Sequence, residues 1–259
     1  MADNIIKDIW KYRHLIILFS FNEVKLRYRN SVLGFVWLFL EPLLMLSILY
    51  FVFTNIIQTK IENYPLYLLL GLIIWYMFSR ATTLGLSSLS DRVGILKTIY
   101  IRKEIIVISA CLTSFIMMLF EFAALGVFMA VFQFVPPITI VLLPLLLVSL
   151  FFLSLGVSFF LSIMNVHFKD IKFIWQVILQ AGFFLSPIIY SLETFPENLR
   201  HVLLLNPMVP LLDTSHKLAL YNSLPTPTTV IFLISLTVGV FISGLLVFKI
   251  KSKFLVENL

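Results

Sequence analysis

The sequence has 259 residues, of which 60% are hydrophobic and only 12% are charged. A soluble domain of this size cannot cover so much apolar surface with so few charged side chains, so the composition excludes a soluble protein. Several apolar runs reach the roughly 20 residues that cross a bilayer, which predicts an all-α polytopic membrane protein. The net charge of +6 comes from basic residues beside these runs, where they face anionic lipid, and it does not indicate nucleic-acid binding.

The first predicted element is residues 1–30, a basic segment that contains Trp10, Tyr12 and a short apolar run at 15–21. The run is too short to span a membrane. Aromatic and basic residues in alternation are typical of an amphipathic helix in the membrane interface, with its charged side chains in water. We therefore expect a cytoplasmic interfacial helix here, and a solvated tail is the alternative.

Six transmembrane helices are predicted next, and residues 249–259 form a cytoplasmic tail. If both termini lie in the cytoplasm, all but three of the 19 Lys and Arg residues fall on the inner side. This asymmetry is the usual determinant of orientation in membrane proteins. The predicted spans are 34–57, 64–84, 105–134, 138–164, 173–190 and 228–248.

Two of these spans carry a carboxylate, namely Glu41 in the first and Glu121 in the third. A carboxylate at this depth is costly and normally faces the interior of a bundle or an aqueous path. Pro42 removes a backbone hydrogen bond beside Glu41 and should loosen the helix there. A structural glutamate that ties two helices together is an equal alternative, and the role of Glu121 stays open.

The fifth span has polar and aromatic residues on one face. Phe173, Gln176, Gln180 and Phe184 recur at steps of three and four residues, the spacing of a helical stripe. Amides are unusual on a surface that faces lipid. The stripe therefore predicts either a helix interface or a polar conduit lined with aromatic rings.

Residues 86–104 form the second cytoplasmic segment. Leu89, Val93 and Leu96 fall at helical spacing beside Asp91 and Arg92, which predicts a helix on the cytoplasmic surface.

The long outer segment 191–227 is punctuated by prolines. Pro196 suits the first turn of a helix, Asn206–Pro207 stops that helix, and Pro210 allows a second helix toward Tyr221. Each piece is too short to span, so we expect two short re-entrant helices between spans five and six.

Signals of enzymatic chemistry are missing from the sequence. None of the nine glycines is followed by lysine, so the chain has no P-loop. The four histidines show no metal-ligand spacing. Asp213, Ser215 and His216 are the residue types of a catalytic triad, but residues so close in sequence seldom adopt triad geometry. We expect a chain that is not an enzyme and holds neither a metal nor a cofactor.

Three stretches together resemble the ABC-2 type permeases that export lipid-linked cell-envelope polysaccharide, such as O-antigen or teichoic acid. They are RYRNSVLGFVWLFLEPLL, WYMFSRATTLGLSSLSDRVGILKTIYIRKE, and FKDIKFIWQVILQAGFFLSPIIYS followed by LLLNPMVPLLD. The resemblance covers nearly the whole chain. It departs from the family pattern at Ile101, where a proline is expected, and at Lys169, where an arginine is expected.

The resemblance implies a single ABC-2 transmembrane domain over residues 1–259, in a homodimer in the bacterial inner membrane. A polysaccharide conduit would lie between the subunits, and a separate ATPase would bind ATP and Mg²⁺. The implied sites are a headgroup-binding site (Lys25, Arg27, Arg29), a conduit lining (Trp37, Glu41, Phe173, Gln176, Gln180, Phe184) and an ATPase-coupling helix (Leu89, Asp91, Arg92, Val93, Leu96).

Alternatives remain at this stage. The arginines could serve only as positive-inside anchors. The chain could also belong to an ABC-2 exporter of drugs or lipids, or to an integral-membrane sugar or acyl transferase. The sequence does not specify the sugar, its linkage, or the choice between O-antigen and teichoic acid.

Overall fold

The computed structural model describes residues 10–29, 31–56, 58, 61–94, 102–204 and 206–252, apart from the side chain of residue 201. All regular structure in these residues is helical, which confirms the predicted all-α class. The α-helices and 3-10 helices (η) are α2 (Arg13–Tyr28), η1 (Gly34–Val36), α3 (Trp37–Asn55), α4 (Tyr64–Ser87), α6 (Lys103–Val131), η2 (Ile138–Leu142), α7 (Leu143–His167), α8 (Ile171–Phe184), η3 (Leu192–Thr194), α9 (Glu197–Leu203), α10 (Met208–Leu220) and α11 (Pro227–Ser252).

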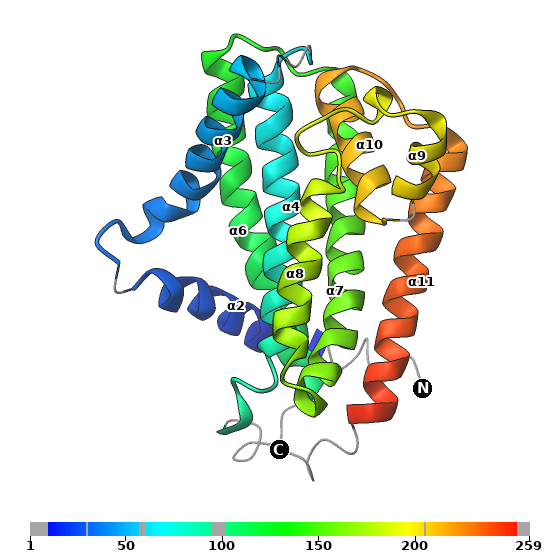
Figure 1. The fold of residues 1–259 in the computed structure, drawn as a ribbon. Helices are drawn as coiled ribbons and strands as arrows, with labels where there is room; N and C mark the ends of the chain where they lie inside the picture. Colours follow the sequence, from blue (N-terminus) through cyan, green and yellow to red (C-terminus); the bar gives the residue numbers. More distant parts are fainter. Residues whose placement is uncertain are drawn as a thin grey trace.

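Five segments are long and apolar enough to cross a membrane, and each coincides with a predicted span. Taken together with α8, they run alternately up and down in one bundle, while α2 lies across the lower end of the bundle and α9 and α10 lie at the upper end (Figure 1). The five segments are Gly34–Asn55, Tyr64–Ser87, Lys103–Val131, Ile138–His167 and Pro227–Ser252. The chain is therefore a polytopic membrane protein.

The predicted fifth span, 173–190, ends earlier than expected. Helix α8 has 14 residues and stops at Phe184, so it measures about 21 Å against the roughly 30 Å of a hydrocarbon core. The reason is local: Pro187 lacks an N–H group and disfavours helical geometry at Ser186. Residues 185–190 instead form an irregular turn whose residues 186–189 are buried.

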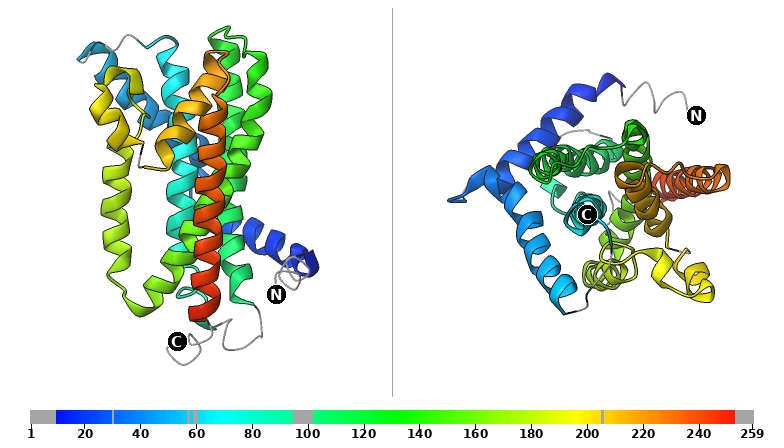
Figure 2. Two further views of the ribbon diagram at one scale, coloured as in Figure 1. Left: turned by 90° about the vertical axis from the view of Figure 1, so that its right-hand side faces the viewer. Right: turned by 90° about the horizontal axis from the view of Figure 1, so that it is seen from above.

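Helix α4 is the centre of the bundle. It contacts α3, α6, α7, α8 and α10, and Figure 2 shows it from above among these neighbours. Of its most apolar stretch, 72% is buried, compared with 22% for the first apolar segment and 17% for α11. The peripheral segments therefore expose most of their apolar side chains at the surface of a single chain.

Close helix contacts depend on small residues. A Cβ atom on Gly244 of α11 would lie 2.2 Å from the carbonyl oxygen of Gly156 in α7, so only glycine fits at this crossing. Similarly, a Cβ on Gly85 of α4 would lie 2.4 Å from the Cβ of Ser158. Small residues at such positions let helix backbones approach closely inside a membrane.

The turn after α8 is held by side chains of α4. The Tyr64 hydroxyl donates to the carbonyl of Ile189 at 3.0 Å, and the Tyr67 hydroxyl lies 3.1 Å from the carbonyl of Pro187. Asn206 links this turn to α10, because its Nδ2 donates to Ser186 and its Oδ1 accepts from the backbone N–H of Met208. Irregular backbone within a membrane protein needs such internal partners.

Candidate functional site

The junction of α2 and α3 forms one side of the candidate site. Helix α2 buries Ile16, Ser20 and Val24, and the Ser20 hydroxyl lies 3.0 Å from the backbone carbonyl of Ser109 in α6. The chain then turns into the first apolar segment through Gly34, whose φ of +50° is a conformation that favours glycine. Helix α2 is thus fixed at the lower flank of the bundle, with one face toward the start of α3 (Figure 1).

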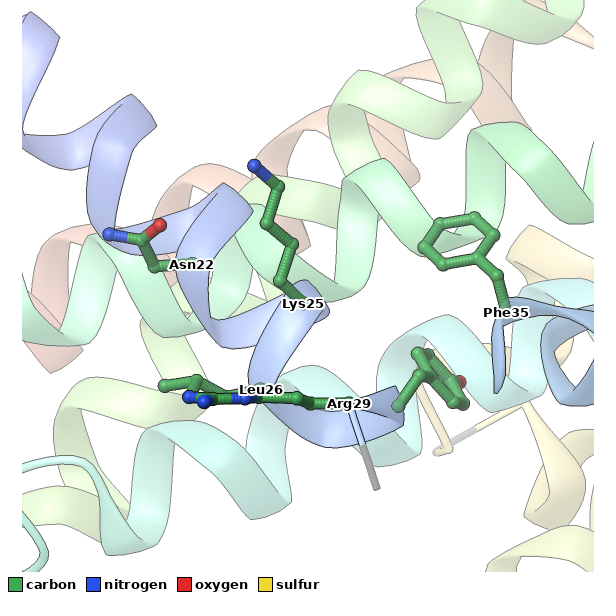
Figure 3. A pocket seen from close by; sticks show the side chains of 6 residues that line it. Asn22, Lys25, Leu26, Arg29 and Phe35 are labelled. Carbon is green, nitrogen blue, oxygen red and sulfur yellow. The ribbon is translucent and has the colours of Figure 1, made fainter. Parts of the chain in front are cut away.

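A pocket of about 620 Å³ lies at this junction, and we call it the basic pocket. Figure 3 shows its residues on α2 and, across from them, Phe35. Lys25 and Arg29 share a face of α2 because they are four residues apart. The described lining includes no carboxylate, so this pocket suits an anion. It is lined by Asn22, Lys25, Leu26, Tyr28, Arg29 and Phe35.

Aromatic rings stand beside the two basic residues. The ring of Phe35 packs edge-on against Tyr28 at 5.6 Å and against Phe120 of α6 at 5.3 Å, measured between centroids. Burial raises the pKa of Tyr28, so its hydroxyl stays protonated and can donate a hydrogen bond. The pocket therefore combines cations, a hydroxyl donor and an apolar wall.

A second pocket of about 350 Å³ also has Tyr28 in its lining, and we call it the mixed-charge pocket. It contains Arg27, which is two residues from Arg29 and so points to the opposite side of α2. Trp37 and Glu41 also line it, so the structure brings these two predicted conduit residues together with Arg27. The full lining is Arg27, Tyr28, Trp37, Glu41, Arg80 and Met117.

An ion pair inside the bundle forms the inner boundary of the mixed-charge pocket. The guanidinium of Arg80 in α4 contacts both carboxylate oxygens of Glu121 in α6, at 2.5 and 2.7 Å. The Glu121 side chain is fully buried, and the Arg80 side chain is 11% exposed. Arg80 is one of the basic residues that the positive-inside count assigns to the inner side, although it lies within the predicted span 64–84, and the structure has it inside α4, paired with Glu121. The sequence did contain a signal for this pair: one apolar run carries an arginine and another carries a carboxylate, and two such charges are expected to pair inside a bundle.

The predicted conduit residues of α8 line neither pocket. Helix α8 packs Leu179 and Phe183 against the bundle. Its opposite side is exposed and includes apolar residues beside the predicted stripe. Helices α3 and α8 both pack on α4, and the pocket that contains Trp37 and Glu41 has no α8 residue in its described lining. The exposed residues of the stripe are Phe173, Gln176, Gln180 and Phe184.

The predicted coupling residues differ in their surroundings. Leu89 is fully buried in the core, Asp91 is exposed and Val93 is half-buried. Arg92 forms an ion pair with Glu23 of α2 at 2.7 Å and lies over the ring of Phe19 at 5.4 Å. Leu96 lies outside the described residues. Within the described part of this segment, Asp91 is therefore the charged side chain most open to a partner.

Metal chemistry has no visible site in the described part of the chain, which contains no group of three or more His, Cys, Asp and Glu residues arranged to hold an ion. What the geometry offers is an apolar bundle with cationic and ion-paired pockets at one flank. These features define an integral membrane protein whose basic and ion-paired side chains gather near one end of its helices.

Comparison with known families gives the particular class. Residues 14–218 match the family described as ABC-2 type transporter, and the chain belongs to this family. It is a membrane subunit of such a transporter. Subunits of this kind are not catalytic, so the chain is not an enzyme.

Several relatives are similar over most of the chain. The O-antigen export system permease protein RfbA of Myxococcus xanthus is 29% identical, over 98% of this chain and 99% of that protein. The polysialic acid transport protein KpsM of Escherichia coli is 23% identical, over 89% and 91%. The capsule polysaccharide export inner-membrane protein CtrC of Neisseria meningitidis is 27% identical, over 72% of each chain.

Proposed function

We propose that this chain is the membrane subunit of an exporter that moves lipid-linked polysaccharide across the inner membrane of a bacterium. A separate nucleotide-binding subunit, which holds ATP and Mg²⁺, drives the transport. The names of the relatives support this substrate class, since they describe export of O-antigen, transport of polysialic acid and export of capsule polysaccharide. Among lipid-linked polymers, these names favour the O-antigen or capsular type over teichoic acid.

The basic pocket is the observation that carries the proposal. A lipid-linked glycan presents an anionic phosphate group between an apolar tail and a sugar chain. The basic pocket offers matching groups, because Lys25 and Arg29 are cationic and Phe35 supplies an apolar wall. An arginine guanidinium can bind two phosphate oxygens at once. Positive-inside anchoring needs only the positive charge, which a lysine supplies equally well.

The proposed arrangement in the membrane follows from the bundle. Helix α2 lies in the cytoplasmic interface, both termini are cytoplasmic, and α8 with the turn after it completes a sixth crossing. Helices α9 and α10 are re-entrant from the outer side. The direction of each helix in Figure 1 supports this arrangement, because α2 and the end of α11 lie at the same end of the bundle.

We further propose a homodimer with the conduit between its subunits. The faces of α3 and α8 that a single chain leaves exposed would line this conduit, together with Trp37 and Glu41. Gln176 and Gln180 support this assignment, because amides on an otherwise apolar exposed helix are unfavourable against lipid.

The test is reconstitution of this chain with its partner ATPase in proteoliposomes. ATP-dependent transfer of the lipid-linked polymer into the lumen is expected only when both subunits are present. This chain alone should hydrolyse no ATP, and a partner subunit that cannot hydrolyse ATP is the matched control. Transfer of drugs or simple lipids without transfer of polymer would show an ABC-2 exporter of another substrate class.

A further inference from the structure

A pocket of about 790 Å³ lies at the end of the bundle opposite α2, and we call it the α10 pocket. Five parts of the chain form it: the end of α3, the segment between α3 and α4, the first turn of α4, the turn and η3 after α8, and α10 with the residues that follow. It is larger than the basic pocket and the mixed-charge pocket. Volumes of this size are typical of sites for small organic ligands.

The lining of the α10 pocket differs in chemistry from that of the basic pocket. Three tyrosines and a phenylalanine provide flat aromatic faces, and hydroxyl, amide and carboxylate groups stand among them. The lining is Phe53, Gln58, Ile61, Tyr67, Ile189, Tyr190, Ser191, Glu193, Thr194, Asp213, His216, Lys217, Tyr221 and Ser223. Sugar rings have C–H-rich faces that pack on aromatic rings, and their hydroxyls need donors and acceptors around the rim.

The inner wall of the α10 pocket is held in place by its own contacts. The imidazole of His216 stacks on the ring of Tyr67 at 3.7 Å, and its Nε2 lies 3.0 Å from the Tyr67 carbonyl oxygen. The Tyr67 hydroxyl in turn donates to the carbonyl of Tyr190 at 2.9 Å. Three separate segments are thus joined behind the pocket, so the aromatic wall is preorganised.

The charges of the described lining suit a sugar better than a phosphate. The ammonium group in this lining belongs to Lys217, and its Nζ already pairs with Oδ2 of Asp213 at 2.7 Å. The carboxylate of Glu193 is exposed and has no ion-pair partner among the described residues. Free carboxylates accept hydrogen bonds from sugar hydroxyls and repel anions.

We infer that the α10 pocket binds a short stretch of the sugar chain of the exported polymer. This inference rests on the proposed function and deepens it, because under that proposal the pocket lies on the outer side. One subunit would then have two sites of opposite character, a cationic site for the lipid-linked phosphate and an aromatic, carboxylate-rimmed site for sugars. The side chains expected to contact sugar most directly are Tyr221 and Glu193, since both are exposed.

The test measures binding of oligosaccharides released by mild acid from the cell-surface polysaccharide of the host bacterium. The protein is the full chain assembled with its partner ATPase in nanodiscs, without ATP. Wild type is expected to bind these fragments, and Glu193→Gln and Tyr221→Ala should each weaken binding about tenfold. Glu197→Gln is the matched control, because Glu197 is also exposed, lies in α9 and is outside the pocket lining.

The outcomes separate this inference from the proposed function. Export of polymer by the wild-type complex, together with no fragment binding or with equal binding by all variants, would overturn the α10 site and leave the proposed function standing. A wild-type complex that exports no polymer would overturn both. Assembly with the ATPase and thermal stability are measured for each variant to check that the fold is intact. Both are expected to be unchanged, because neither substituted side chain belongs to the buried contacts behind the pocket.

Discussion

The two ends of the bundle solve the problem of buried polar groups in different ways. At the α2 end, opposite charges are paired, as in Arg80–Glu121 and Arg92–Glu23. At the α10 end, neutral groups donate to the backbone, as Tyr64 does to the turn after α8. The buried ion pair therefore lies near the proposed headgroup site, whereas the Lys217–Asp213 pair of the α10 end is partly exposed and neutral hydrogen bonds hold the irregular backbone there.

This difference has energetic consequences. A buried ion pair is stable only while both partners are present, because the remaining charge is otherwise left without compensation in a medium of low dielectric constant. A neutral hydrogen bond contributes about 1 kcal/mol and its loss is milder. The two ends should therefore respond differently to mutation and to pH.

The largest effect is expected from Glu121→Leu, which leaves the Arg80 guanidinium in the bundle without its carboxylate. The free energy of unfolding should fall by about 3–5 kcal/mol. Thermal unfolding of the purified protein in detergent measures this loss. The double variant Arg80→Met with Glu121→Leu should recover most of it, and a double variant as unstable as the single one would mean that charge compensation is not the role of this pair.

The second prediction concerns pH at the α10 end. Burial lowers the pKa of His216 to about 3 from an ordinary value of 6.5, an effect opposed by its hydrogen bond to the Tyr67 backbone. Between these two pH values the unfolded chain binds a proton at His216 that the folded protein does not bind. The contribution of neutral His216 to the free energy of unfolding is therefore complete above pH 6.5 and is lost as the pH drops. At pH 5 this group should reduce the free energy of unfolding by about 2 kcal/mol.

The measurement is the change in thermal stability between pH 7.5 and pH 5. His216→Phe keeps a flat ring against Tyr67 but cannot titrate, so the variant should lose that part of the pH dependence. An identical pH dependence in wild type and variant would show that His216 is not buried in its neutral form.

The third prediction separates the two arginines at the α2 end. Arg29→Lys keeps the charge of the basic pocket but loses the fork, and export of the lipid-linked polymer should fall about fivefold, or about 1 kcal/mol. Arg27→Lys should have a smaller effect, because Arg27 lines the mixed-charge pocket instead. Export is compared at matched membrane levels of each variant. Equal export by wild type and Arg29→Lys would show that Arg29 acts only as a positive-inside charge and does not bind the phosphate through its fork.

The smallest effect is expected at the segment proposed to couple to the ATPase. Asp91 is exposed, and Asp91→Lys should weaken assembly with the partner a few-fold, as is usual for a charge at the rim of an interface. Pull-down of the partner from detergent extracts measures assembly, with Glu62→Lys at the opposite end of the bundle as the control. Unchanged assembly would place the contact elsewhere on the cytoplasmic side.

Local chemistry made much of the fold predictable. Apolar length alone located the five long segments, and the prolines of the 191–227 segment located the two short helices. In the structure, Pro196 is the N-cap of α9 and Pro207 is the N-cap of α10. These features depend on residues that are neighbours in the sequence, so no knowledge of packing was needed.

The candidate site was less predictable, because it depends on how distant helices pack. Arg80 and Glu121 are 41 residues apart, and only the contact between α4 and α6 pairs them. Burial of Leu89 likewise depends on the bundle and not on the helical spacing that suggested a surface role. The separation of Arg27 from Arg29 is different, since their spacing of two residues already placed them on opposite sides of one helix.

The Arg92–Glu23 ion pair has a mechanical consequence. It fastens the segment after α4 to α2 only two residues before Lys25 and six before Arg29. We therefore expect a displacement of that segment to be passed on to α2, which carries Lys25 and Arg29 of the basic pocket. This ion pair is thus a direct mechanical connection between the segment proposed to contact the ATPase and the pocket proposed to bind the lipid-linked phosphate.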